Sequence, residues 1–172
     1  MADDATMTIS AVILPDEISK TLESQTYGYT PADATEGWYY KMVDVTTSSG
    51  NLIGTETFLQ KGAAAAGVDV GSAMPAISTS DKVKFLFIKH TGYRDDGTTA
   101  NTADSVFLVF DGGSAAHGAA DAVEVGPSEC WFGKFNGLTV GNLNCISAQK
   151  AAAGSGGNKI QCFVAAVIDD VA

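Results

Sequence analysis

The sequence has few charged residues, few histidines and no long apolar run. Charged side chains make up 17% of the 172 residues, and the two histidines are His90 and His117. The longest apolar stretches are far shorter than the roughly 20 residues of a transmembrane helix. The acidic N-terminus lacks the basic segment that opens a signal peptide. We therefore expect neither a membrane span nor a secretion signal.

Common catalytic motifs are also missing. There is no G-x-S-x-G elbow, no Walker loop and no G-x-G-x-x-G after a strand. Cys145 and His90 could be imagined as a Cys–His pair, but no local pattern supports one. His90, at the end of a predicted strand, and His117, in a Gly/Ala-rich loop, are interpreted as structural or solvated. The sequence thus predicts no catalytic residue, no cofactor-binding residue and no enzyme activity.

The cysteine pattern does not suggest a disulfide framework. Cys130, Cys145 and Cys162 are an odd number of widely spaced residues without a CxxC motif. Their neighbours are largely apolar, and unpaired cysteines are often fully buried. We expect three buried free thiols and folding in the cytosol.

The balance of charge argues against nucleic-acid binding. Twenty acidic and ten basic residues give a formal charge of −10, which repels phosphate, and no basic stripe is present. Asp95, Asp96 and Asp104 lie close together in sequence, but their spacing differs from that of a calcium-binding EF-hand loop. We interpret them as turn residues. Cysteine and histidine spacings do not match a zinc site, so no metal ligand is predicted.

Segments rich in apolar residues indicate strands. The clearest are Lys82–His90 and Ser105–Asp111, short segments rich in Phe, Val, Leu and Ile and bounded by turn residues. Residues 91–104 between them predict a long exposed hairpin loop. Trp38–Thr46 is a third confident strand because aromatic and β-branched residues suit a pleated surface. The remaining candidate strands are 7–14, 52–59, 122–125, 128–135, 144–148 and 158–168.

Turn residues punctuate these strands. Residues 47–51 predict a turn that joins 38–46 and 52–59 in a hairpin, and Asn136-Gly137 is a strong turn signal. Residues 15–23 could form a short helix or an extended linker. The Gly/Ala-rich stretches are predicted to be loops or connectors; they are 62–67, 112–120 and 150–157.

Together these segments predict an all-β protein with eight or nine strands and little helix. Uneven connections favour a jelly-roll-like β-sandwich over an up-and-down barrel. We expect a single domain over residues 1–172. Residues 1–10 are either an extended N-terminal arm or a frayed end.

Four stretches of the chain resemble a known group of proteins. They are residues 9–18, 32–41, 87–92 and 164–171, and they resemble small structural proteins of tailed bacteriophages that infect marine bacteria and cyanobacteria. The resemblance implies a virion component made in the host cytoplasm, and specifically a capsid decoration (cement) protein on the capsid exterior. Such a protein bridges subunits of the major capsid protein and stabilises the assembled shell by mass action. A homo-oligomer, commonly a trimer, is implied as well.

Two alternatives remain open at this stage. One is a tail or tail-tube subunit, which would form hexameric rings. The other is a carbohydrate-binding jelly roll for host attachment. In that alternative, Asp95, Asp96 or Asp104 could hold a calcium ion. Its stacking platforms would come from the aromatic residues Tyr27, Tyr29, Trp38, Tyr39, Tyr40 and Trp131, although aromatics in strands usually belong to the core.

Overall fold

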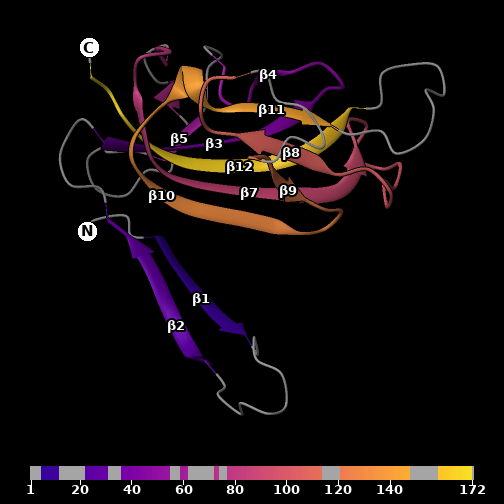
Figure 1. Cartoon of the computed structure of the whole chain (residues 1–172), viewed down its shortest axis with the longest axis horizontal. Helices are drawn as coiled ribbons and strands as arrows, with labels where there is room; N and C mark the ends of the chain where they lie inside the picture. The colour runs from indigo at the N-terminus through magenta and orange to yellow at the C-terminus, as the bar shows by residue number, and fades with distance from the viewer. Residues whose placement is uncertain are drawn as a thin grey trace. The chain divides into compact units, whose positions relative to one another are not determined.

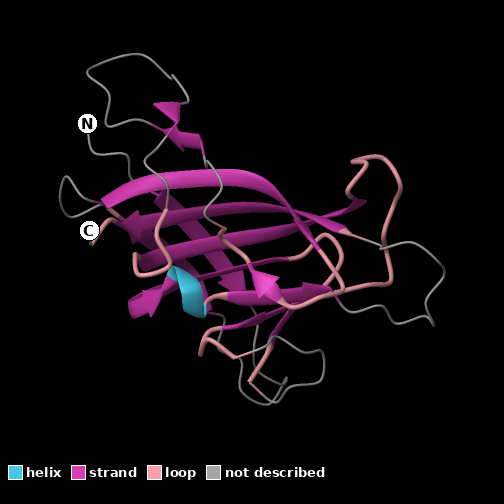
Figure 2. Ribbon diagram, turned by 90° about the horizontal axis from the view of Figure 1, so that it is seen from above, coloured by secondary structure: helices cyan, strands magenta, loops and turns pink. Residues whose placement is uncertain are grey.

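The computed structural model describes residues 5–11, 22–30, 36–54, 59–61, 72–73, 77–113, 121–147 and 159–171. These residues form twelve strands and one helix, the three-residue 3-10 turn η1 (Val140–Asn142), which is cyan in Figure 2. The all-β class is therefore confirmed. The strand number exceeds the predicted eight or nine because four strands have only two or three residues. The chain divides into two compact units, residues 1–34 and 35–172.

The first unit contains an antiparallel hairpin. Strand β1 (Ala5–Ala11) pairs with β2 (Leu22–Tyr29), and the register becomes irregular after Ile9. The predicted strand 7–14 thus begins earlier than expected. The ambiguous segment 15–23 lies mostly outside the described residues, and its last two residues belong to β2.

The second unit contains two antiparallel sheets. The six-stranded sheet has the order β10-β7-β12-β3-β5-β6, and the four-stranded sheet has the order β4-β11-β8-β9. Figure 1 shows β10, β7 and β12 running side by side. The strands are β3 (Glu36–Val45), β4 (Gly50–Asn51), β5 (Leu59–Lys61), β6 (Ser72–Ala73), β7 (Lys82–Arg94), β8 (Val106–Val109), β9 (Val123–Val125), β10 (Cys130–Thr139), β11 (Asn144–Ser147) and β12 (Ile160–Asp169).

The two sheets share one hydrophobic core. The six-stranded sheet contributes residues such as Leu86, Ile88 and Val164, and the four-stranded sheet contributes Leu108 and Cys145, among others. Full burial of one such aliphatic side chain stabilises a fold by about 1.5–3 kcal/mol. A core enclosed between two antiparallel sheets is the arrangement of a β-sandwich, as the sequence predicted.

The predicted hairpin over 38–59 is correct in pairing Tyr40 with Leu59 but wrong in its direct turn at 47–51. Strand β4 lies within the expected turn and pairs with β11, whereas β3 pairs with β5. Leu52 and Ile53 lie in a bend outside any strand and are almost fully buried. Their apolar character reflects core packing after the chain has crossed to the second sheet.

Three other local predictions need correction. Residues 91–104 do not close a hairpin, because β7 and β8 lie in different sheets. Asn136-Gly137 lies within β10, where the register shifts between Lys134 and Leu138. Gly137 has a φ of +124° there, so the freedom of glycine permits a strand irregularity in place of a hairpin turn. His90 is not at a strand end, because β7 continues to Arg94 and its ladder with β12 reaches that residue.

Candidate functional site

The six-stranded sheet has apolar side chains on both of its faces. Alternate residues of β7, such as Leu86 and Ile88, belong to the core between the sheets. Because successive side chains of a strand point to opposite faces, Phe87 lies on the outer face. The same alternation holds in β12, where Val164 is in the core and Phe163 is not.

We define the aromatic face as the outward residues of β3, β7, β10 and β12 that are large, apolar and accessible. Met42 is 44% exposed, and the other members are partly exposed. An antiparallel sheet normally carries polar residues on a solvent-facing side, and contiguous exposed apolar surface marks interaction sites. The members are Trp38, Tyr40, Met42, Phe87, Phe132 and Phe163.

The strand register brings these residues together. Phe87 lies opposite Phe132 on one neighbouring strand and opposite Ala165 on the other, and Ala165 lies opposite Tyr40. The Phe87 and Phe163 rings are 6.3 Å apart at 62°, within the range of favourable edge-to-face pairs. The aromatic face is therefore built on four hydrogen-bonded strands, and at its Trp38 end the outward residues Val167 and Phe85 are buried.

Charged residues border this surface. Lys89 is exposed on β7 and lies opposite Phe163 in the ladder. Lys84 contacts Asp169 at 3.1 Å and Glu36 at 3.8 Å. An apolar centre with a charged rim is the usual composition of a protein–protein contact surface.

The aromatic residues proposed as sugar platforms are divided between the two faces. Tyr39 is 3% exposed within the core, and burial, followed by the charges of Asp170 and Asp81, raises its pKa to about 12. Trp131 packs against the core with Phe110, at a ring distance of 5.2 Å. Neither Tyr39 nor Trp131 is therefore placed as an open platform.

Trp38 and Tyr40 are the two platform candidates that lie on the aromatic face. Trp38 makes an edge contact with buried Phe85 at 5.7 Å. Tyr29 is partly exposed in the first unit, and the side chain of Tyr27 lies outside the described residues. Aromatic character alone did not distinguish these positions, because β3 is apolar at consecutive residues on both of its faces.

His90 is a buried structural residue. Its Nδ1 accepts a hydrogen bond from the Gly92 backbone N–H at 2.9 Å, which leaves the proton on Nε2 for donation to the Asp104 carbonyl at 3.0 Å. Burial lowers the pKa of His90, although Asp104 and Glu129 act in the opposite direction. With both ring nitrogens engaged by backbone groups, His90 is not arranged to act as a general base. His117 lies outside the described residues.

The three cysteines are free, but they are not all buried. Burial raises the pKa of Cys145 and of Cys162 to about 12, so neither forms a thiolate at neutral pH. Cys130 is exposed, which corrects the expectation of three buried thiols. It lies at an outward position of β10, opposite Lys89.

The loop aspartates have separate partners. The Thr99 hydroxyl donates a hydrogen bond to the Asp96 carboxylate, and the Thr99 and Thr98 backbone N–H groups donate to it at 2.7 and 2.8 Å. These hydrogen bonds lower the pKa of Asp96 to about 2. Asp95 lies 3.9 Å from Lys159. Asp104 is buried and accepts a hydrogen bond from the Asn101 amide. Among the described residues, no group of three or more Asp, Glu, His or Cys side chains is placed to hold a metal.

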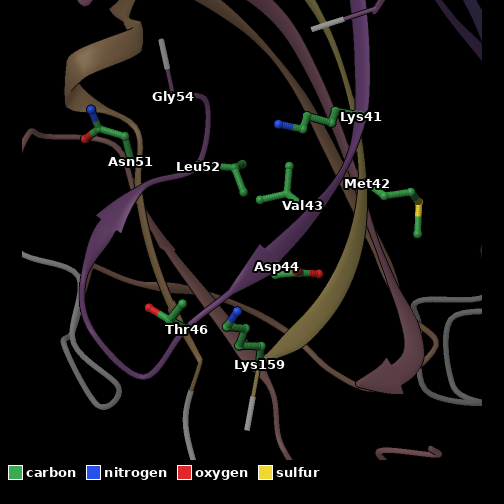
Figure 3. A pocket seen from close by; sticks show the side chains of 9 residues that line it. All are labelled: Lys41, Met42, Val43, Asp44, Thr46, Asn51, Leu52, Gly54 and Lys159. Atoms are coloured by element: carbon green, nitrogen blue, oxygen red, sulfur yellow. The ribbon is translucent and has the colours of Figure 1, made fainter. Parts of the chain in front are cut away.

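A hollow of about 350 Å³ lies beside β3 (Figure 3). Val43 and Leu52 point toward each other in its centre, whereas Met42 and Asp44 point away from them. Lys41 and Lys159 also line it, as does Asp44, so its charged residues are of both signs. Its described lining includes no histidine or cysteine, and we assign it no catalytic chemistry.

Comparisons with protein families, with curated proteins and with solved structures found no match. In the described part of the chain, no helix has the length and apolar character needed to cross a membrane. The aromatic face is therefore the best-supported candidate site, on physical grounds alone.

Proposed function

We propose that this chain is a bacteriophage virion structural protein, and specifically a capsid decoration protein that binds subunits of the major capsid protein. The observation that supports this proposal most is the aromatic face on the outside of the sandwich. Its apolar residues provide contact area that gains free energy only when a partner removes them from water. The proposed partner, a capsid protein, is inferred from the stretches of sequence that resemble phage structural proteins.

The functional consequence is stabilisation of the assembled shell. A protein that binds only the assembled lattice lowers the free energy of that state, and the gain grows with the concentration of free protein relative to the dissociation constant. Copies that bridge neighbouring capsid subunits would resist internal pressure. Closed symmetry, such as a trimer, would let one oligomer contact several subunits.

Co-sedimentation with empty capsids tests this proposal. We expect the wild-type chain to sediment with capsids assembled from the major capsid protein of the phage that encodes it. The double variant Met42→Ser, Phe163→Ser should remain in the supernatant while keeping a wild-type circular dichroism spectrum. Asp95→Asn changes a loop residue outside the aromatic face, so it is the control and should bind as wild type. Wild-type binding by the double variant would contradict the assignment of the interface.

Carbohydrate binding is a second candidate, supported by the outward placement of Trp38 and Tyr40. Aromatic rings on a sheet surface can stack on sugar rings. A glycan array with wild type and Trp38→Ala distinguishes the two functions. Specific glycan binding that Trp38→Ala abolishes, without co-sedimentation with capsids, would favour a host-attachment module. Sedimentation with phage tails in place of capsids would favour the tail-subunit alternative.

A further inference from the structure

The dipeptide Asn136-Gly137 lies in the irregular part of β10. The ladder between β10 and β7 pairs residues up to Lys134 and resumes at Leu138, so its register skips residues 135–137. Both residues of the dipeptide are exposed. Gly137 has a φ of +124°, far from the φ of a regular strand. The backbone at this dipeptide is therefore not fixed by the ladder that holds the rest of β10.

The space around Gly137 is open. A Cβ added there would meet no atom of the described residues within 4 Å, its chain neighbours apart. Glycine also lacks the side chain that restricts the backbone of other residues. The backbone nitrogen of Gly137 can therefore approach the side-chain amide carbon of Asn136 without displacing a packed neighbour.

We propose that Asn136 is a site of spontaneous deamidation in the native protein, with water as the co-reactant. Hydroxide removes the proton from the Gly137 backbone nitrogen, which attacks Cγ of Asn136. The new C–N bond closes a succinimide ring, and the side-chain nitrogen takes a proton from water and leaves as ammonia. Water then opens one of the two imide C–N bonds, which leaves aspartate or isoaspartate at position 136. No redox change occurs, and the step does not depend on the proposed capsid function.

The other asparagines of the chain are less suited to this reaction. None of them precedes a glycine. Asn101 is buried, and its side-chain amide donates to Asp104 Oδ2 at 3.1 Å. Asn144 is also buried, and its amide donates to the Gly113 carbonyl at 3.0 Å. Amides engaged in this way are held in place, so Asn136 should react first.

Two Asp-Gly dipeptides offer the same ring closure, but their carboxylates are anchored. The carboxylate of Asp96, before Gly97, accepts the hydrogen bonds described above and has a pKa of about 2. It is therefore ionised at neutral pH, and an ionised carboxylate is a poor electrophile. In the second dipeptide, Asp111 Oδ1 accepts a hydrogen bond from the Gly113 backbone N–H at 2.8 Å.

Peptide mapping by mass spectrometry tests the site in the full chain. After incubation at mildly alkaline pH, the peptide that contains residue 136 should be the first to exchange its amide for a carboxyl group. An isoaspartate methyltransferase should then label that peptide. The rate in the native protein should lie within about tenfold of the rate in guanidinium chloride, because little local structure must open for the reaction.

Two variants sharpen the test. Asn136→Gln should abolish labelling of this peptide, because glutamine forms the corresponding six-membered ring far more slowly. Asn51→Gln changes an exposed asparagine that precedes leucine, and its rate at residue 136 should stay within about twofold of wild type. Earlier conversion of another asparagine would overturn the proposal. So would an unconverted residue 136 in native wild type under conditions that convert the unfolded chain, a comparison that needs no variant to fold.

Discussion

The two faces of the six-stranded sheet are both apolar, yet they are in different surroundings. On β7, Leu86 and Ile88 are fully buried against the four-stranded sheet, whereas their neighbour Phe87 is partly exposed on the outer side. The inner face stabilises the fold of one chain. The outer face has large apolar residues that the sandwich core does not require. An apolar residue in a strand is therefore not by itself a core residue, and the second face of a sheet can serve contact with a partner.

The largest expected difference between the faces is in stability. Ile88→Ala should lower the free energy of unfolding by about 2–5 kcal/mol, because it leaves a cavity in the core. Phe87→Ala, one residue away on the opposite face, should cost about 0.5–1.5 kcal/mol, the contribution of its ring pair with Phe163. Urea unfolding of both variants measures this contrast. Equal losses would show that the outer residues are a second core.

A substitution that crowds the Trp131 ring should have a smaller effect on stability. A Cβ added at Gly133 would lie 2.7 Å from Cη2 of the Trp131 ring, so Gly133→Ala must displace a ring that packs with Phe110 and Phe135. We expect a loss of about 1–3 kcal/mol and a changed near-ultraviolet circular dichroism spectrum. Lys134→Ala, the adjacent outward position, is the control and should leave that spectrum unchanged.

His90 makes the inner face sensitive to acid. Burial lowers its pKa below the usual value, so just below that usual value the unfolded chain binds more protons than the folded chain. The stability contributed by neutral His90 is thus complete above about pH 6.5 and declines as the pH falls further. Tm measured between about pH 7 and pH 5 should fall in the wild type and fall less steeply in His90→Gln. Identical slopes would assign the acid sensitivity to other groups.

The smallest expected effect concerns the chemical reactivity of the three cysteines. Cys130 is exposed on the outer face, and Cys145 and Cys162 are buried with raised pKa values. Iodoacetamide should therefore modify one thiol in the native protein and three in guanidinium chloride, as counted by mass spectrometry. Rapid native modification of Cys162 would show that the core opens readily.

Much of the fold could be predicted from local composition. The dense apolar segments around 82–90 and 160–168 became the central strands β7 and β12, since β-branched and aromatic residues suit a buried sheet. The positions of β4 and of Leu52 could not be predicted, because chain crossing between sheets depends on long-range packing. Asn136-Gly137 predicted a turn, but in the structure it lies at an irregularity in the register of β10.

The candidate sites were less predictable than the fold. In β3, residues 38–43 are apolar or long-chained at nearly every position, so alternation alone could not say which face was inward. The structure decided it by placing Tyr39 in the core and Met42 outside.

The central claim is that the aromatic face is the surface that contacts a partner. A cryo-electron microscopy reconstruction of the phage particles tests it most directly. The account predicts copies of this chain on the outer capsid lattice, with Met42, Phe87 and Phe163 covered by major capsid protein. Copies whose aromatic face points into solvent, or particles that lack the chain on the capsid, would contradict it.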